Sequence, residues 1–288
     1  MIAWPTPLID ELARRRAIIF LGSGVSKNSM GIGGKRPPLW KEFLELGVIR
    51  CADKKRAREI SKLIKESDLL TACELLHDAL GNEWENLILE EFVNPQYPPS
   101  EIHQHIFSLD SRLVITQNFD KIYDTYASAA SQGTVVVKSY DEGDVSNFIR
   151  KRQRLVIKAH GSIDAPNDMV FTKGDYARAR HKFAAFYALL DGLMLTHTCL
   201  FLGCGINDPD IQVLLERNVQ LHPTSNPHYI AMGARYSDEF RRAVKKTMNL
   251  ELLQYNPKDN HSELRSSLET LVELVDQKKQ DLVNTRDW

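Results

Sequence analysis

The clearest absences from this 288-residue chain are a paired cysteine motif, a long apolar run and an excess of one charge. The four cysteines, Cys51, Cys73, Cys199 and Cys204, form no Cys-x-x-Cys pair, so we expect no zinc or other metal site. No apolar run is long enough to cross a bilayer, and we expect no membrane partner. The 37 Lys and Arg residues balance 38 Asp and Glu residues, which argues against a general nucleic-acid coat.

The first residues also lack the basic start and apolar stretch of a secretion signal. Scattered cysteines without such a signal predict a cytoplasmic protein, because thiols stay reduced in that compartment. One basic run, KKRAR at 54–58, is typical of a solvated helix face. We therefore expect nucleic acid to meet this protein only indirectly, through a partner.

Residues 17–26, AIIFLGSGVS, are the most informative stretch that is present. The apolar run AIIFL has the length of a strand buried on both faces. It ends at Gly22, Ser23 and Gly24, and a helix that includes Ser26 is expected to follow. A strand, a glycine turn and a helix start form a phosphate cradle, although a plain tight turn has the same pattern. The Gly-Lys-Ser/Thr of a P-loop is missing, which argues against ATP hydrolysis.

The rest of the chain divides into two patterns. Residues 39–107 show helical periodicity with no strand signal, and they follow a Gly- and Pro-rich loop at 27–38. That loop either folds over a bound ligand or is a plain connector. From 112 onward, short apolar runs alternate with helical stretches, which predicts strands at 112–117, 134–138, 155–159, 198–202, 228–232 and 251–255, and helices at 121–130, 176–196, 209–220, 238–248 and 262–283.

This alternation predicts an α/β fold, a Rossmann-like doubly wound parallel sheet with an inserted helical subdomain. We expect a single domain, 1–288, with its core in 17–38 and 108–288 and its insertion in 39–107. Ligands of such sheets bind beyond the carboxyl ends of the strands. The expected strand ends carry GSG, QNFD, HGS and GCG, the last of which places Gly203 and Gly205 at the same rim. Glycines, an amide, a carboxylate and an imidazole gathered at one rim favour a ligand site.

The order GSGVS, TQNFD, KAHGS, FLGCGINDPD resembles the sirtuin (SIR2-like) superfamily, and within it the bacterial SIR2-like proteins of anti-phage defence. The resemblance covers about 17–255. It implies NAD as the ligand and substrate, cleaved at the nicotinamide–ribose bond to ADP-ribose and nicotinamide. The four-cysteine zinc module of deacetylating sirtuins is missing, GIGGKRPPLW replaces their Asp-Phe-Arg stretch, and Phe119 stands where an aliphatic residue is usual. These departures favour NAD hydrolysis over deacylation.

Cleavage of that bond builds positive charge on the ribose and releases a neutral base, so it needs orientation and a general base but no general acid. His160 suits the base, because imidazole is the usual side-chain base near neutral pH. Asn118 can hold ribose hydroxyls and the attacking water. His160 and Asn118 are therefore the candidate catalytic residues.

The remaining site candidates are expected to bind the NAD molecule. The backbone around Gly22, Ser23 and Gly24 is expected to hold the diphosphate, and a valine at Gly22 is expected to weaken NAD binding more than folding. Asp120 either accepts a hydrogen bond from the nicotinamide amide or caps the next helix. The full set of candidate NAD contacts is Gly22, Ser23, Gly24, Ser26, Gln117, Asp120, Gly203 and Gly205.

Three functions remain open from the residues: an NAD hydrolase, an NAD- or ADP-ribose-binding subunit of an oligomeric ATPase or nuclease complex, and, less favoured, a deacylase. A hydrolase that destroys NAD must be restrained, which favours control by subunit contacts. We expect a homo-oligomer, and the resemblance adds a HerA-type hexameric ATPase as the leading partner. The N-terminal helix with Trp4, the helices of 39–93 and the C-terminal helix ending at Trp288 are the expected contact surfaces.

Overall fold

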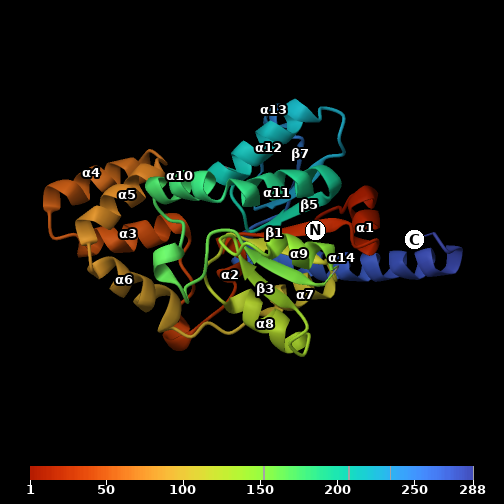
Figure 1. Ribbon diagram of the computed structural model, residues 1–288, viewed down its shortest axis with the longest axis horizontal. Coiled ribbons are helices and arrows are strands. Elements are labelled where there is room, and N and C mark those ends of the chain that lie inside the picture. Colours follow the sequence, from red (N-terminus) through yellow and green to blue (C-terminus); the bar gives the residue numbers. More distant parts are fainter. Residues whose placement is uncertain (152, 207, 234, 288) are drawn as a thin grey trace.

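The computed structural model describes residues 1–151, 153–206, 208–233 and 235–287, so the predicted contact residue Trp288 lies outside the described residues. Its centre is a seven-stranded, all-parallel sheet in the order β3-β4-β2-β1-β5-β6-β7 (Figure 1). The α/β, doubly wound fold class is thereby confirmed. Every predicted strand is present, with bounds β1 (Ala17–Leu21), β2 (Leu113–Thr116), β3 (Val136–Ser139), β4 (Leu155–Lys158), β5 (Thr198–Leu202), β6 (His228–Met232) and β7 (Leu250–Gln254).

Helices cover both faces of the sheet, because the central strands are apolar on both sides. In β1, Ile19 and Leu21 face one helix layer, while Ile18 and Phe20 face the other. The first layer contains α1 (Thr6–Ala13), α7 (Glu101–Ser108), α8 (Ile122–Ala130) and α14 (Lys258–Thr285). The second contains α9 (Val145–Arg150), α10 (Lys173–Lys182), α11 (Ala184–Thr196), α12 (Pro209–Leu221) and α13 (Asp238–Met248).

The strand order places a topological switch point beside β1. The chain leaves β1 toward β2 on one side and returns, after β4, to β5 on the other side. The carboxyl ends of β1 and β5 therefore diverge into connections on opposite sides, which leaves a crevice for a ligand between them. A one-turn helix, α2 (Ser23–Ser26), follows β1 at this point.

A second body of helices lies beyond the carboxyl edge of the sheet, at the left of Figure 1. It contains α3 (Trp40–Arg50), α4 (Lys54–Lys65), α5 (Leu69–Leu80), α6 (Glu83–Ile88) and a π-helical turn (Leu89–Val93). Its own core gathers Phe43, Trp84 and Leu76 with Phe171 of the sheet domain. By contrast, α7 packs with α8 and α14 against the sheet. We therefore propose that the insertion ends before α7 rather than at 107.

One predicted helix is interrupted. The single helix expected at 176–196 is two helices, α10 and α11, that meet at Phe183, whose backbone (φ −114°, ψ 38°) is not helical. The Phe183 ring packs edge-on against Tyr140 at a centroid distance of 5.0 Å. The sequence around this break contains no glycine or proline, so no local signal predicts it. The contact between Phe183 and Tyr140 is the feature that accompanies the break.

Two histidines are buried, each with one ring nitrogen that has no hydrogen-bond partner among the described residues. His103 in α7 and His228 in β6 each use Nδ1 to accept a backbone N–H, from Ser100 and Cys199 respectively, at 3.1 Å. Their Nε2 atoms are buried without a partner among the described residues. Burial lowers the pKa of each ring to about 4 from an ordinary 6.5. Both rings are therefore neutral in the folded protein at neutral pH.

This predicts a loss of stability between about pH 6.5 and pH 4. The unfolded chain takes up both protons near the ordinary pKa, whereas the folded chain resists them until about pH 4. The free energy of unfolding should fall by about 3 kcal/mol for each histidine. Urea titrations at stepped pH check this, with His103→Asn and His228→Asn as variants whose amide oxygen can still accept the backbone N–H. Variants with the same pH slope as the wild type would contradict the assignment.

Candidate functional site

A cavity of about 740 Å³ lies at the carboxyl edge of the sheet. Its walls include the residues that follow six strands, β4, β2, β1, β5, β6 and β7. These strands are consecutive neighbours in the sheet. Because neighbouring strands lie about 4.8 Å apart, six strands give the site a length of about 24 Å. His160, beyond β4, lies at one end of this row and Tyr255, beyond β7, at the other. The shape suits an extended ligand that crosses the switch point.

The cavity brings together every candidate residue predicted from the sequence: Gly22, Ser23, Gly24, Ser26, Gln117, Asn118, Asp120, His160, Gly203 and Gly205. The 27–38 loop also contributes lining residues, including Lys27 and Arg36, so it borders the cavity. What each residue does to a ligand remains a prediction, and the contacts described below refine it.

The two glycine turns pack directly on each other. Gly22 N–H donates to the Leu202 carbonyl and Gly24 N–H donates to the Gly203 carbonyl, both at 3.0 Å. A Cβ atom on Gly22 would lie 2.4 Å from the Gly203 carbonyl oxygen, and Gly203 itself has φ +65°. Gly22 and Gly203 therefore let two backbone turns touch, a role not predicted from the sequence, and the expected contact of the glycines with a ligand stays a prediction. Of the three N–H groups expected to hold a diphosphate, only that of Ser23 has no acceptor among the described residues.

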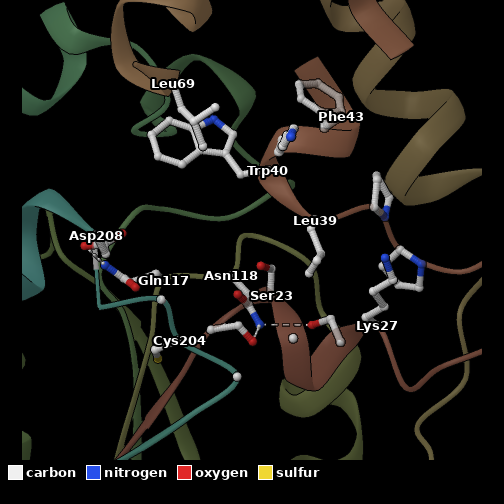
Figure 2. Close-up of a pocket in the computed structure, with 18 of the residues that line it drawn as sticks. Ser23, Lys27, Leu39, Trp40, Phe43, Leu69, Gln117, Asn118, Cys204 and Asp208 are labelled. Carbon is white, nitrogen blue, oxygen red and sulfur yellow. Dashed lines mark hydrogen bonds between the residues drawn. The ribbon is translucent and has the colours of Figure 1, made fainter. Parts of the chain in front are cut away.

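Asn118 is held by a chain of hydrogen bonds (Figure 2). Its Nδ2 donates to the Gly22 carbonyl at 3.0 Å and to Ser26 Oγ at 2.9 Å. Ser26 Oγ in turn donates to Asp120 Oδ2 at 2.7 Å, and Asp120 Oδ1 accepts the backbone N–H of Ile122. Both N–H groups of the amide are thus used, which leaves Asn118 Oδ1 as the atom that can accept from a ligand. Ser26 and Asp120 orient Asn118, and Asp120 also accepts the N–H of the first residue of α8.

A buried ion pair supports this loop from behind. Lys158 Nζ lies 2.7 Å from Asp124 Oδ2 and also donates to the Asp120 backbone carbonyl. Burial raises the pKa of the Asp124 carboxyl, and the Lys158 charge opposes that rise. Removing one partner of such a pair leaves an uncompensated buried charge. Lys158 therefore fixes the position of the Asp120 backbone next to Asn118.

Gln117 also contacts protein at the cavity. Its Nε2 donates to Asp208 Oδ1 at 2.7 Å, and the same oxygen accepts the backbone N–H groups of Asp210 and Ile211 at the start of α12. Figure 2 shows Gln117 and Asp208 side by side at one edge of the pocket. This contact joins the ends of β2 and β5 across β1.

His160 is buried and pairs with a carboxylate that sequence reasoning missed. Its Nε2 lies 3.1 Å from Asp210 Oδ2. Burial would raise the pKa of Asp210, but the hydrogen bond from His160 and the charge of Arg180 hold it below its ordinary value. The Tyr176 ring stands edge-on to the imidazole at a centroid distance of 5.1 Å. Because a carboxylate only accepts, an ionised Asp210 can form this hydrogen bond only with a protonated Nε2.

The helical insertion forms the opposite wall. Figure 2 shows Leu39, Trp40 and Leu69 across the pocket from Asn118. Phe119, within the TQNFD stretch, packs against Phe92 of the insertion and Phe171 at centroid distances of 4.8 and 4.6 Å. An aromatic residue at this position therefore ties the Asn118 loop to the insertion core.

The four cysteines are unpaired and buried. Burial raises the pKa of the Cys204 thiol beside the cavity, so it is a poor nucleophile at neutral pH. Within the described ranges no three His, Cys, Asp or Glu side chains gather as metal ligands. Among the same residues, no helix is long and apolar enough to cross a membrane.

The fold and the site define a doubly wound α/β protein whose ligand cavity crosses the switch point of a parallel sheet, a class typical of nucleotide binding. Comparison with known proteins shows which family this chain is similar to. A SIR2-like domain matches residues 112–253, from the residue before β2 into β7. This part of the chain is similar to the SIR2-like family, and the motifs of the sequence predict that likeness.

Curated relatives extend this likeness to most of the chain. NAD(+) hydrolase ThsA of Enterococcus faecium is 27% identical over 240 residues, which cover 80% of this chain and 46% of the relative. NAD(+) hydrolase ThsA of Acinetobacter baumannii (strain 532279) is 25% identical, with 77% and 43% covered. Defense-associated sirtuin 2 of Bacillus subtilis is 25% identical, with 77% and 21% covered. The chain thus spans less than half the length of these relatives.

Proposed function

We propose that this protein hydrolyses NAD at the nicotinamide–ribose bond, giving ADP-ribose and nicotinamide. The observation that carries the proposal is the placement of His160 and Asn118 together at one end of a long cavity that crosses the switch point of a SIR2-like fold. Relatives named NAD(+) hydrolase ThsA support the same reaction. Within the cavity, the nicotinamide ribose would lie near Asn118 and the adenosine half toward Gly203 and Gly205.

The contacts suggest how the reaction proceeds. As the C–N bond breaks, positive charge develops on the ribose, and nicotinamide leaves as a neutral molecule. Asn118 Oδ1, the free acceptor of its amide, would hold a ribose hydroxyl or the attacking water in place. His160 Nδ1 would take the proton from that hydroxyl or water, since Nε2 is committed to Asp210. The Ser23 N–H and the charges of Lys27 and Arg36 would hold the diphosphate.

The direct test is to incubate the purified protein with NAD, alone and with candidate partners, and to follow nicotinamide release. Stoichiometric appearance of nicotinamide and ADP-ribose is expected. Binding of NAD or ADP-ribose without release would instead favour the binding-subunit alternative. Release that requires an acylated peptide would favour a deacylase.

The names of the same relatives support a proposal for the cellular role. One is named Defense-associated sirtuin 2, which supports a role as an anti-phage effector that depletes NAD. The four unpaired, buried cysteines support a cytoplasmic location. Infection of cells that carry the gene should lower cellular NAD, and cells that carry a His160→Ala variant should keep theirs.

Assembly is a further prediction. NAD depletion must be restrained before infection, and self-contacts of such a domain commonly close into symmetric rings. We expect a homo-oligomer in solution, with a HerA-type ATPase as an additional partner. Light scattering checks the first part: a mass near 32.9 kDa at micromolar concentration would contradict it. Failure to co-purify with such an ATPase, with NAD consumption unchanged by its addition, would exclude the second.

A further inference from the structure

We infer that Asp210 is the positioning residue that fixes the protonation of His160, and that Arg180 and Tyr187 hold it ready for that role. The inference rests on the proposed function, and it concerns a group that does not line the cavity itself. Asp210 is the second residue of α12, and Asp208 is the capping residue of that helix. It is buried, and so is the His160 ring.

The contacts of Asp210 leave one arrangement of protons. Oδ1 accepts from Arg180, with Nε at 2.8 Å and Nη2 as a second donor. Oδ2 accepts from Tyr187 OH and faces His160 Nε2, each at 3.1 Å. Arg180 is always protonated and can only donate, so it favours an ionised Asp210, to which Tyr187 OH and His160 Nε2 must then donate. His160 therefore presents a lone pair on Nδ1 in its neutral form.

The helices that carry these groups explain how they meet at one carboxylate. Arg180 is on the last turn of α10, and Tyr187 is on the first turn of α11, on either side of the break at Phe183. The break thus lets two helices reach one carboxylate. Tyr176, also on α10, packs its ring against His160. The far end of α10 contacts the insertion, where Gly174 N–H donates to Glu74 of α5 at 2.8 Å.

Asp210→Asn tests the inference, because the two atoms of the new amide have different partners. The two N–H donors of the Arg180 guanidinium require an acceptor, so the amide oxygen of the asparagine takes the position of Asp210 Oδ1. The NH₂ group then takes the position of Oδ2 and faces His160 Nε2. Nε2 must then accept, and the proton moves to Nδ1, which removes the base. We expect kcat to fall by about 10²-fold or more, while KM changes by less than about threefold.

Matched variants separate positioning from stability. Asp191→Asn is the control: Asp191 on α11 pairs with Arg217 at 2.8 Å, outside the cavity. It should leave kcat and KM unchanged. Tyr187→Phe removes one hydrogen bond to Asp210 but no acceptor, so it should lower kcat by less than about tenfold. Thermal unfolding of each variant identifies any general loss of structure.

Nitrogen NMR of ¹⁵N-histidine-labelled protein gives a readout that is independent of activity. The wild-type His160 ring should be protonated at Nε2 and unprotonated at Nδ1, and Asp210→Asn should reverse or mix the two forms. A wild-type ring protonated at Nδ1, or an Asp210→Asn variant with the wild-type kcat, would overturn the inference. If the wild-type protein releases no nicotinamide, the proposed function fails, and the NMR result still decides whether Asp210 fixes the His160 proton.

Discussion

Alanine at His160 or at Asn118 should lower the rate of NAD cleavage by about 10²-fold or more, with the fold kept. His160→Ala removes the proposed base. The Asp210 carboxylate then keeps its bonds to Arg180 and Tyr187, so no buried charge is left alone. Asn118→Ala removes the acceptor for the ribose hydroxyl or water. It also removes one hydrogen bond each from Ser26 Oγ and the Gly22 carbonyl, which keep Asp120 and the Val25 N–H as their partners.

The controls are a histidine and an asparagine that lie outside the cavity. His222 at the end of α12 and the exposed Asn147 in α9 line no part of it, so His222→Ala and Asn147→Ala should keep the wild-type rate. The measurement is nicotinamide release under saturating NAD, with far-UV circular dichroism to verify folding. Two folded variants, His160→Ala and Asn118→Ala, that consume NAD at the wild-type rate would show that the active site has been assigned wrongly.

The sheet could be predicted because its signals are local. Each strand is a short apolar run that ends at a polar or glycine cluster, and β1, β5 and β6 have the predicted bounds. The same rule led to the strand ends and so to the rim residues. The break at Phe183 could not be predicted in this way. The sequence around the break, HKFAAF, contains neither glycine nor proline. Helix α10 ends where Phe183 contacts Tyr140, which lies 43 positions earlier in the chain.

The site shows the same division between local and distant information. Asn118 and His160 follow strands directly, so their position at the rim follows from the alternation of strands and helices. Asp210 reads in the sequence as one more acidic residue in the first turn of a helix, where it suits the helix dipole. Its partners His160 and Arg180 lie 50 and 30 positions away. Only the packing of α10, α11 and α12 brings them to one carboxylate.

The glycines at the rim show that one sequence pattern can have two physical causes. Both Gly22 and Gly205 are consistent with close approach of a ligand, but a side chain at each would meet different surroundings. A Cβ atom on Gly22 would lie 2.4 Å from the Gly203 carbonyl and 2.8 Å from Cys204 Cα, which are backbone atoms next to a central strand. A Cβ atom on Gly205 would meet no described atom within 4 Å, although Gly205 borders the cavity.

Gly22→Val should therefore act on folding, and Gly205→Val on binding. For Gly22→Val we expect a loss of about 3 kcal/mol or more in the free energy of unfolding, since neither turn can move away without breaking the β1–β5 pairing. For Gly205→Val we expect near wild-type stability and an affinity for ADP-ribose reduced by about tenfold or more, because the branched side chain fills cavity space. Urea unfolding and calorimetric titration with ADP-ribose, which is not consumed, measure the two effects.

Gly143→Val is the matched control for both glycine variants. Gly143 lies before α9, outside the cavity, and a Cβ atom there also meets no described atom within 4 Å. This variant should keep both stability and affinity, so it corrects for the general cost of replacing a flexible residue by valine. A stable Gly22→Val protein that has lost only ligand affinity would show that the turn does meet the ligand. An unchanged affinity in Gly205→Val would place the ligand away from the end of β5.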